Sequence, residues 1–367
     1  MPPEARLDRL LSECRKEGID GLIIVPGPNM RYLIDFTLEV FERPAFLVAG
    51  FGDKPALLVP HLDYERAQEA VSKLCEVASY TDETGPWKWM EERLSELVGV
   101  AGIEGRIPLG LFKNLEKRAG RLSFVVVDNF LHSLRISKDT EEVSRHREAA
   151  RILQEAMLRT LTELQPGLKE RELMFRFHRH ADELGAETSY CLIQSGPNSS
   201  KPHLEPTSRT VKSEDVVVFD AALTYRGYYA DITRTVCIGR PSVSLLKIYN
   251  VVKEAQQKAL DRAMPGVPAE DVDKAARKRI ADEGLAEYFI HRTGHGLGVE
   301  VHEEPYIKNG NRKPLKNGMI FTVEPGIYLP AKFGVRLEDN VVVTTSGIEN
   351  TTYIPKTLSL RETLDAQ

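Results

Sequence analysis

The sequence predicts two domains: an α/β domain with a mixed sheet over residues 1–135, and an α+β domain with an internal pseudo-twofold duplication over residues 136–367. Three observations carry this prediction. A chain of 367 residues has the length of about two domains. Short apolar runs alternate with helical patterns in the first third of the chain. One order of elements, two helices and then strands, occurs twice in the rest.

The composition is that of a soluble globular protein, with 42% hydrophobic and 28% charged residues. The net charge is −5 and no block of like charge stands out, which argues against nucleic acid and anionic membranes as partners. The first 18 residues lack the apolar stretch of a signal peptide, and no apolar run approaches the ~20 residues of a membrane helix. Four widely spaced cysteines indicate reduced, mostly buried thiols, so we expect a cytoplasmic protein: Cys14, Cys75, Cys191 and Cys237.

The first domain begins with an amphipathic helix. Residues 4–17 place Leu7, Leu10, Leu11 and Cys14 on one helical face. Short apolar runs bounded by glycine and proline then predict strands at 21–25, 45–49, 56–60 and 124–128.

We place the domain boundary in the segment from Leu134 to Asp139. Ser137 or Asp139 can cap a long helix that runs to about Leu164.

The second domain contains a faint duplication. Residues 161–187 and 260–287 each read as a helix end, a Pro-Gly turn and a second helix. The offset recurs in later pairs: Pro166 and Pro265 are 99 positions apart, His203 and His302 are 99, Asp220 and Glu324 are 104, and Asp231 and Glu338 are 107. Chance recurrence of Pro-Gly punctuation is the alternative. A true duplication would bring both carboxylate pairs to one central site.

Residues 216–236 predict a hairpin that carries two aspartates. Asp220 ends an apolar strand, Arg226 and Gly227 form the turn, and Asp231 lies on the next strand. Adjacent antiparallel strands can aim both carboxylates at one point. Taken alone, the stretch favours the alternative that Asp220 merely ends a strand and Asp231 is a solvated turn residue, since aspartates at strand ends are common.

Residues 291–303, HRTGHGLGVEVHE, hold three histidines. Glycines flank His295 and permit close approach of the backbone. The stretch lacks dinucleotide-loop spacing and opens no helix, so we reject that function. The alternation of Val299 and Val301 predicts a strand that delivers His302. His291 is equally well explained as a structural group.

Two further carboxylates lie on apolar strands. Glu324 closes the run IFTV, where burying an uncompensated charge is costly. In residues 334–344 the two-residue period places Arg336 and Glu338 on one face of a strand. A salt bridge to one of the carboxylates is the plain alternative for Arg336.

Four carboxylates and one imidazole suit hard or borderline divalent ions. Their negative charge exceeds what one such ion needs, so we expect two, which together can activate a water and polarise a carbonyl. The predicted metal ligands are Asp220, Asp231, His295, Glu324 and Glu338. The loop 195–203 ends at His203. A single histidine in a loop is usually just exposed, and only its repeat relation to His302 makes His203 a candidate functional residue. The remaining histidines are read as structural: His61, His132, His146, His178 and His180.

With these residues in view, the whole chain resembles the pita-bread metallopeptidases, in the branch of prolidase and Xaa-Pro aminopeptidase, and the first domain resembles the creatinase-like N-terminal domain of that branch. The motif at 291–303 carries most of the resemblance. It implies a creatinase/aminopeptidase-like catalytic fold in which Asp231 and Glu338 bridge two metal ions. His203, His302 and Glu324 are the implied catalytic residues, and His291 and Arg336 the substrate-binding ones.

The implied activity is hydrolysis of the bond between an N-terminal residue and proline in small peptides, with prolidase favoured over Xaa-Pro aminopeptidase. Methionine aminopeptidase and a non-catalytic peptide-binding relative are weaker alternatives. The resemblance implies two divalent metal ions per subunit as the cofactor, Mn or Co first, with Zn or Fe also compatible. It also implies a homodimer. Residues 31–36, RYLIDF, depart from the YLTGF-like sequence of many relatives, which leaves recognition of the substrate's end open.

Overall fold

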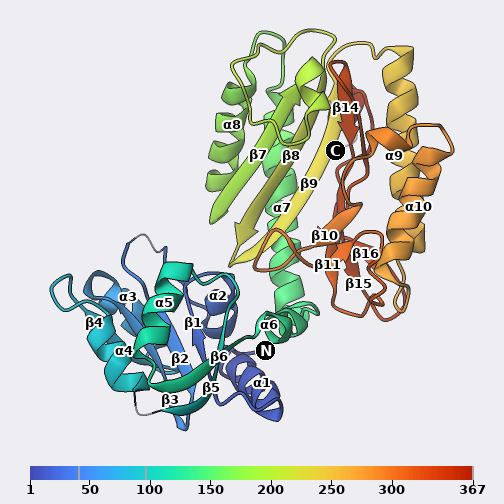
Figure 1. Ribbon diagram of the computed structural model, residues 1–367. Helices are drawn as coiled ribbons and strands as arrows, with labels where there is room; N and C mark the ends of the chain where they lie inside the picture. Colours follow the sequence, from blue (N-terminus) through green and yellow to red (C-terminus); the bar gives the residue numbers. More distant parts are fainter. Residues whose placement is uncertain (40–41, 96, 366–367) are drawn as a thin grey trace. The chain divides into compact units, whose positions relative to one another are not determined.

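The computed structural model describes residues 1–39, 42–95 and 97–365 (Figure 1). They form two compact units, Met1–Arg135 and Ile136–Gln367. Among the described residues, no helix has both the length and the apolar character needed to cross a membrane.

The first unit is built on a six-stranded sheet in the order β4-β3-β2-β1-β5-β6. β1 pairs antiparallel with β2 and parallel with β5, so the sheet is mixed, as predicted. Its elements are α1 (Pro3–Lys16), β1 (Gly21–Ile24), α2 (Pro28–Ile34), β2 (Phe46–Gly50), β3 (Asp53–Pro60), a 3-10 turn (His61–Asp63), α3 (Tyr64–Val71), β4 (Glu76–Tyr80), α4 (Trp87–Leu94), β5 (Val98–Ile103), α5 (Leu109–Arg118), β6 (Arg121–Val126) and α6 (Asp128–Arg135).

The last predicted strand of this unit is displaced. β6 ends at Val126, two residues before the predicted end, because Asp128 already begins α6. The Asp128 carboxylate accepts a hydrogen bond from the Gly105 backbone at 2.9 Å, which fixes the start of that helix beside the end of β5.

The second unit begins with a long capped helix. Asp139, not Ser137, is the N-cap of α7: its carboxylate accepts from the Glu142 N–H, and the Glu142 carboxylate accepts from the Asp139 N–H. The elements are α7 (Thr140–Thr162), α8 (Glu170–Glu183), β7 (Thr188–Ser195), a 3-10 turn (Gly196–Ser200), β8 (Val216–Tyr225), β9 (Tyr228–Cys237), α9 (Val243–Arg262), α10 (Ala269–Ala281), a 3-10 turn (Ala286–Tyr288), β10 (Gly294–Gly296), β11 (Glu303–Ile307), β12 (Ile320–Val323), β13 (Gly326–Leu329), β14 (Phe333–Arg336), β15 (Asp339–Val343), β16 (Ile348–Asn350) and α11 (Leu360–Asp365).

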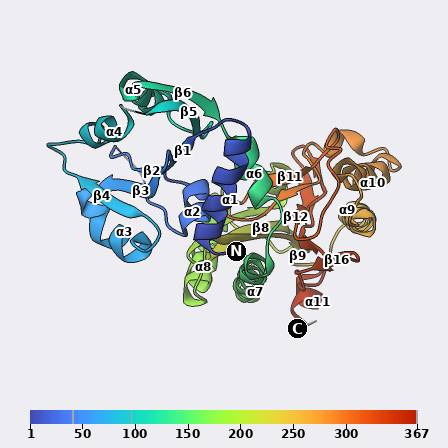
Figure 2. The ribbon, with the colours of Figure 1, turned by 90° about the horizontal axis from the view of Figure 1, so that it is seen from below.

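This unit has the predicted doubled plan of two helices followed by strands. Among the described residues its strands form a sheet in the order β7-β8-β9, a sheet in the order β11-β10-β12-β15-β16, and a two-stranded sheet of β13 and β14. An apolar core lies between α7, α8 and the first sheet, and another lies between α9, α10 and strands of the second half. Figures 1 and 2 show the strands between the two helix pairs. The duplicated α+β architecture is therefore confirmed.

The two halves meet where β9 runs beside β15. The Asp231 N–H donates to the Asn340 side-chain oxygen at 3.1 Å, and the Glu338 N–H donates to the Thr233 carbonyl at 3.1 Å. One predicted ligand from each half thus lies at the junction.

His146 of α7 is a buried structural histidine, as the sequence indicated, and it predicts a pH-dependent stability. Its Nδ1 lies 2.9 Å from the Tyr229 carbonyl, which can only accept, so Nδ1 carries the proton of the neutral ring. Burial lowers the pKa of His146 to about 4. In the unfolded chain His146 therefore binds a proton near pH 6.5, whereas in the folded chain it does so only near pH 4. The free energy of unfolding accordingly falls as the pH drops from 6.5 towards 4.

We expect His146 to account for a loss of about 2 kcal/mol between pH 7 and pH 5, or roughly 4–8 °C in Tm. In His146→Asn, which keeps a donor for the Tyr229 carbonyl, this part of the loss should disappear. The measurement is thermal unfolding of metal-free protein at both pH values. An equal drop in wild type and variant would contradict the assignment.

Candidate metal centre

The hairpin of β8 and β9 forms as predicted and aligns two aspartates. Arg226 and Gly227 both have positive φ, 46° and 76°, which suits a two-residue turn between twisted strands. In the register, Asp220 lies opposite Thr233 and Asp231 lies opposite Ala222. The two carboxylates are therefore diagonal neighbours on one face of the hairpin.

The second half supplies two glutamates from strand ends. Glu324 directly follows β12, as predicted. Residues 334–344, however, are not one strand: β14 ends at Arg336, β15 begins at Asp339, and Glu338 lies between them. The prediction of one continuous strand is wrong because the N–H groups of Leu337 and Glu338 bond to the carbonyls of Pro325 and Thr233, outside β14 and β15. The side chains of Arg336 and Glu338 still lie on one side, since both bond the Thr233 hydroxyl.

His295 lies in the short strand β10, tightly enclosed by backbone. A Cβ at Gly294 would collide with the Thr322 carbonyl, and one at Gly296 with the Glu304 carbonyl, so the flanking glycines permit the close approach that the sequence indicated. The His295 Nδ1 faces the Gly296 carbonyl at 3.2 Å, which leaves the lone pair of a neutral ring on Nε2.

The segment after His295 differs from the prediction. Val299 to His302 form bends, not a strand, and β11 starts only at Glu303. The backbone turns back at this point, with the Gly298 N–H bonded to the Glu300 carbonyl, so the valine alternation reflects local packing and not strand pairing.

The predicted ligands come together in one buried cluster. Ligand atoms of Asp231, His295 and Glu338 all lie within 4.8 Å of one another, and these residues are 7%, 3% and 1% exposed. The His295 Nε2 lies 3.2 Å from the Glu324 carboxylate, and Asp220 and Glu324 add negative charge beside Asp231.

The cluster fits a divalent cation. One carboxylate oxygen of Asp231 and one of Glu338 are buried without a hydrogen-bond partner, which is costly for a carboxylate. Burial and the neighbouring carboxylates raise the pKa of Asp231 and of Glu338 well above their usual values. A carboxylate set with an imidazole Nε2 among it is the donor chemistry of a hard or borderline metal ion, which would neutralise this charge.

Arg336 connects the cluster to His291. Its guanidinium donates to Asp220 at 2.6 Å, to Thr233 at 3.1 Å and to the Tyr328 hydroxyl at 2.7 Å. The Tyr328 hydroxyl lies 2.9 Å from the His291 Nε2. The salt-bridge alternative for Arg336 is thus present. Both ring nitrogens of His291 face protein groups, the Arg292 carbonyl and the Tyr328 hydroxyl, and its ring packs against the rings of Phe289 and Tyr328.

His302 lies beside the cluster, and His203 is close enough for its charge to act on His302. The His302 ring is 4.2 Å from the His295 ring, edge to face. Partial burial, together with the charges of His295, Arg292 and His203, lowers the pKa of His302 to about 4, so its ring is neutral at pH 7. His203 is exposed in the loop that follows β7.

Several supporting residues escaped prediction. Thr233 donates to Glu338 at 2.7 Å, and the Asn340 amide bonds both the N–H and the carbonyl of Asp231. Thr322 lies 3.2 Å from the Glu324 carboxylate. Thr233 and Thr322 sit two positions from a ligand on the same strand or strand end, so the period of two could have identified them.

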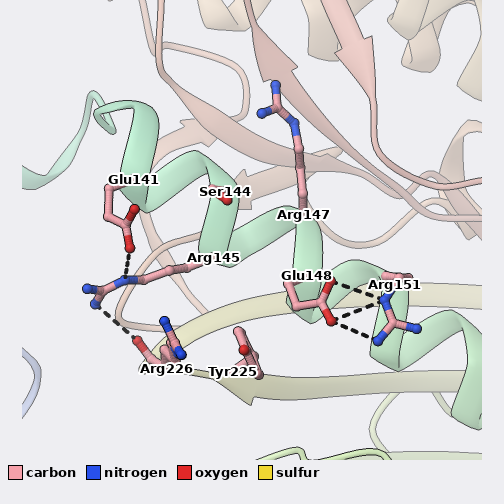
Figure 3. Close-up of a pocket in the computed structure, with 8 residues that line it drawn as sticks. All are labelled: Glu141, Ser144, Arg145, Arg147, Glu148, Arg151, Tyr225 and Arg226. Atoms are coloured by element: carbon pink, nitrogen blue, oxygen red, sulfur yellow. Dashed lines mark hydrogen bonds and ion pairs between the residues drawn. The ribbon is translucent and has the colours of Figure 1, made fainter.

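An arginine-rich hollow of about 410 Å³ on α7 and the hairpin turn is not this site (Figure 3). It contains no predicted ligand. Three of its four arginines pair with acids: Arg145 with Glu141, Arg151 with Glu148, and Arg147 with Glu349.

The duplicated fold and its carboxylate–imidazole cluster define a metal-dependent enzyme, and the comparisons narrow the class to a metallopeptidase. Residues 144–345 match Metallopeptidase family M24, and residues 6–137 match the Creatinase/Prolidase N-terminal domain. The chain therefore belongs to metallopeptidase family M24.

Similarity to known proteins covers nearly the whole chain. A protein named Xaa-Pro dipeptidase from Pyrococcus horikoshii is 34% identical over 95% of this chain and 96% of its own length. The crystal structure of a recombinant prolidase from Thermococcus sibiricus matches with a TM-score of 0.93 and 37% identity, covering 98% of this chain and 99% of that one. The structure of an X-Pro aminopeptidase from Thermotoga maritima has a TM-score of 0.87 and 31% identity, covering 96% and 98%.

Proposed function

We propose that this metallopeptidase is an Xaa-Pro dipeptidase, or prolidase, that hydrolyses small peptides with proline in the second position. The observation that carries the proposal is the full-length similarity to proteins named Xaa-Pro dipeptidase or prolidase. The cofactor we propose is two divalent ions, Mn or Co in preference to Zn or Fe. Homodimer formation and a cytoplasmic location stay predictions.

The proposed ligands are the five residues predicted from the sequence. Asp231 and Glu338 are the natural bridging ligands, because each has a buried carboxylate oxygen that no protein group satisfies. Asp220, His295 and Glu324 would complete the two ion sites. When bound, the ion pair activates a water and polarises the substrate carbonyl.

The protein's own groups would manage the protons and the developing charge. Burial by itself raises the pKa of Glu324, but in the metal-free protein the hydrogen bond and charge of a protonated His295 and the charges of His291 and Arg336 outweigh it and lower that pKa to about 2. Glu324 is thus ionised at pH 7, the form that can bind a metal ion, and we propose that it also relays the proton of the attacking water. His203 and His302 would hydrogen-bond the substrate oxygen and the departing proline nitrogen. Since a prolyl residue has no amide N–H, recognition must depend on the shape of the pocket and not on a hydrogen bond from that nitrogen, and we propose His291 and Arg336 as substrate-binding residues.

His203→Ala should lower kcat by about 10²- to 10³-fold, the usual effect of losing a hydrogen bond made in the transition state. Bound Mn should stay close to the wild-type amount, because His203 is not among the proposed ligands. Steady-state kinetics and elemental analysis of the same preparation test this, with His61→Ala as a control on an exposed histidine of the first unit. Equal losses of metal and activity would contradict the role.

The substrate class is tested by comparing Ala-Pro with Ala-Pro-Ala after loading with Mn²⁺ or Co²⁺. Rapid cleavage of the dipeptide and slow cleavage of the tripeptide are expected. Equal or faster cleavage of the tripeptide would instead indicate an Xaa-Pro aminopeptidase, the second candidate, which the similarity to the Thermotoga maritima structure supports.

Two measurements address the weaker alternatives. Cleavage of Met-Ala peptides without cleavage of Xaa-Pro bonds would indicate a methionine aminopeptidase. Less than one metal equivalent in protein purified without chelator, with no activation by added metal, would indicate a non-catalytic relative.

A further inference from the structure

We propose that Glu170 is a positioning residue that holds the His203 loop in its catalytic geometry. The proposal rests on the role proposed above for His203. Glu170 is the first residue of α8, is fully buried, and is remote in sequence from each predicted ligand.

The Glu170 carboxylate ties together the two ends of the loop. Before His203, its Oε1 accepts from the Ser195 N–H at 2.7 Å and from the Ser195 hydroxyl at 2.8 Å. After His203, its Oε2 accepts from the Thr207 N–H at 3.0 Å and from the Thr207 hydroxyl at 2.6 Å. The Asn198 amide lies 3.1 Å from both oxygens.

These contacts explain how a buried carboxylate is tolerated here. Five neutral donor groups replace its hydration. Arg209, which pairs with Asp215, bonds the Ser195 hydroxyl oxygen at 2.5 Å and so adds a positive charge near Glu170. A group satisfied almost entirely by one loop has little structural purpose other than to fix that loop.

Gln194 restrains the backbone on both sides of His203. This fully buried residue of β7 donates from its side-chain amide to the carbonyls of Pro202 and Leu204, at 3.0 Å each. Those are the two residues that flank His203. With the loop ends held by Glu170 and the flanking backbone held by Gln194, the exposed imidazole has a fixed base.

The other half of the second unit contains a corresponding buried carboxylate. Asp273 of α10 is fully buried and accepts from the Thr293 N–H at 3.2 Å and the Thr293 hydroxyl at 2.7 Å, two residues before His295. In each half, the second helix thus holds the N–H and hydroxyl of a Ser or Thr that leads to a histidine. Asp273 supports a proposed metal ligand, so its loss should affect metal affinity, whereas loss of Glu170 should affect turnover.

The test is Glu170→Gln, which places an amide N–H₂ against N–H and O–H donors. We expect kcat for Ala-Pro to fall about 10- to 100-fold, with KM and the Mn²⁺ dissociation constant within a few-fold of wild type. Glu172→Gln is the matched control on the same helix turn, since Glu172 is exposed and bonds only the Lys169 N–H. It should leave kcat unchanged.

A double-mutant cycle with His203→Ala separates positioning from general damage. If Glu170 acts through His203, the double variant should have the kcat of His203→Ala alone, within about two- to three-fold. Multiplicative losses, or a loss of Mn²⁺ affinity that parallels kcat, would overturn the proposal. If Glu170→Gln does not fold, Thr207→Val removes one donor at the loop exit and should show a smaller loss with the same non-additivity.

The cycle also distinguishes a failure of the role proposed for His203 from a failure of the role proposed for Glu170. A normal kcat in His203→Ala would show that the role proposed for His203 is wrong, and the positioning proposal would fall with it. A large loss in His203→Ala together with multiplicative losses would leave that role intact and overturn only the assignment of Glu170.

Discussion

Asp231→Asn should abolish metal binding and lower activity by on the order of 10³-fold or more, because a proposed bridging ligand is shared by both ions. The same change should stabilise the metal-free protein. Without metal, burial and the charges of Asp220 and Glu324 raise the pKa of Asp231 well above the usual value. Ionised Asp231 therefore costs folding free energy at neutral pH, a cost that a neutral amide avoids.

The measurements are elemental analysis, kinetics with Ala-Pro, and Tm with and without added Mn²⁺. We expect metal to raise the Tm of wild type but not of the variant, and the metal-free variant to melt above metal-free wild type. Asp182→Asn, at an exposed position of α8, should change neither Tm nor metal content. A variant that keeps two ions and full activity would contradict the ligand assignment.

Arg234→Met should destabilise the protein by about 3–5 kcal/mol, which corresponds to roughly 6–20 °C in Tm. Arg234 is 2% exposed and pairs at 2.9 Å with Asp339, which is wholly buried. It also donates to the carbonyls of Thr233, Glu338 and Ile354. Removing it leaves those acceptors unsatisfied and weakens the junction of β9 and β15.

Thermal or urea unfolding measures this effect. Arg147→Met is the matched control, because its ion pair with Glu349 is half exposed and should contribute less than about 1 kcal/mol. A small effect of Arg234→Met would show that Lys356 and Asn350, the other partners of Asp339, suffice to compensate it. Since the Glu338 backbone is one of the lost contacts, a weaker affinity for metal should accompany the lower Tm.

Sequence patterns predicted the structure correctly where one short stretch of chain determines the local conformation. The Arg226–Gly227 turn and the strand that precedes Glu324 formed as predicted, because each depends on residues close in sequence. The glycines around His295 also permit the predicted close approach of backbone, although the carbonyls that they admit, of Thr322 and Glu304, belong to other strands. Pattern failed at Val299–His302 and at 334–344. At 334–343 residues on both faces are buried, so alternation does not mark a strand, and backbone bonds to distant segments decide where the strands begin and end. At 299–302 the backbone turns back through the bond from the Gly298 N–H to the Glu300 carbonyl, which the valine alternation does not reveal.

The sequence by itself determined which side chains could bind metal and that they recur in two halves, since residue type and strand-end position are local properties. Only the tertiary structure decided what holds them. Thr233 donates a hydrogen bond to Glu338, Asn340 bonds the backbone of Asp231, and Glu170 accepts hydrogen bonds from the loop that carries His203. The partners in these bonds are 25 to 109 positions apart in the sequence. Those contacts depend on the register of β9 against β15 and on the packing of α8 beside β7, which no local periodicity encodes.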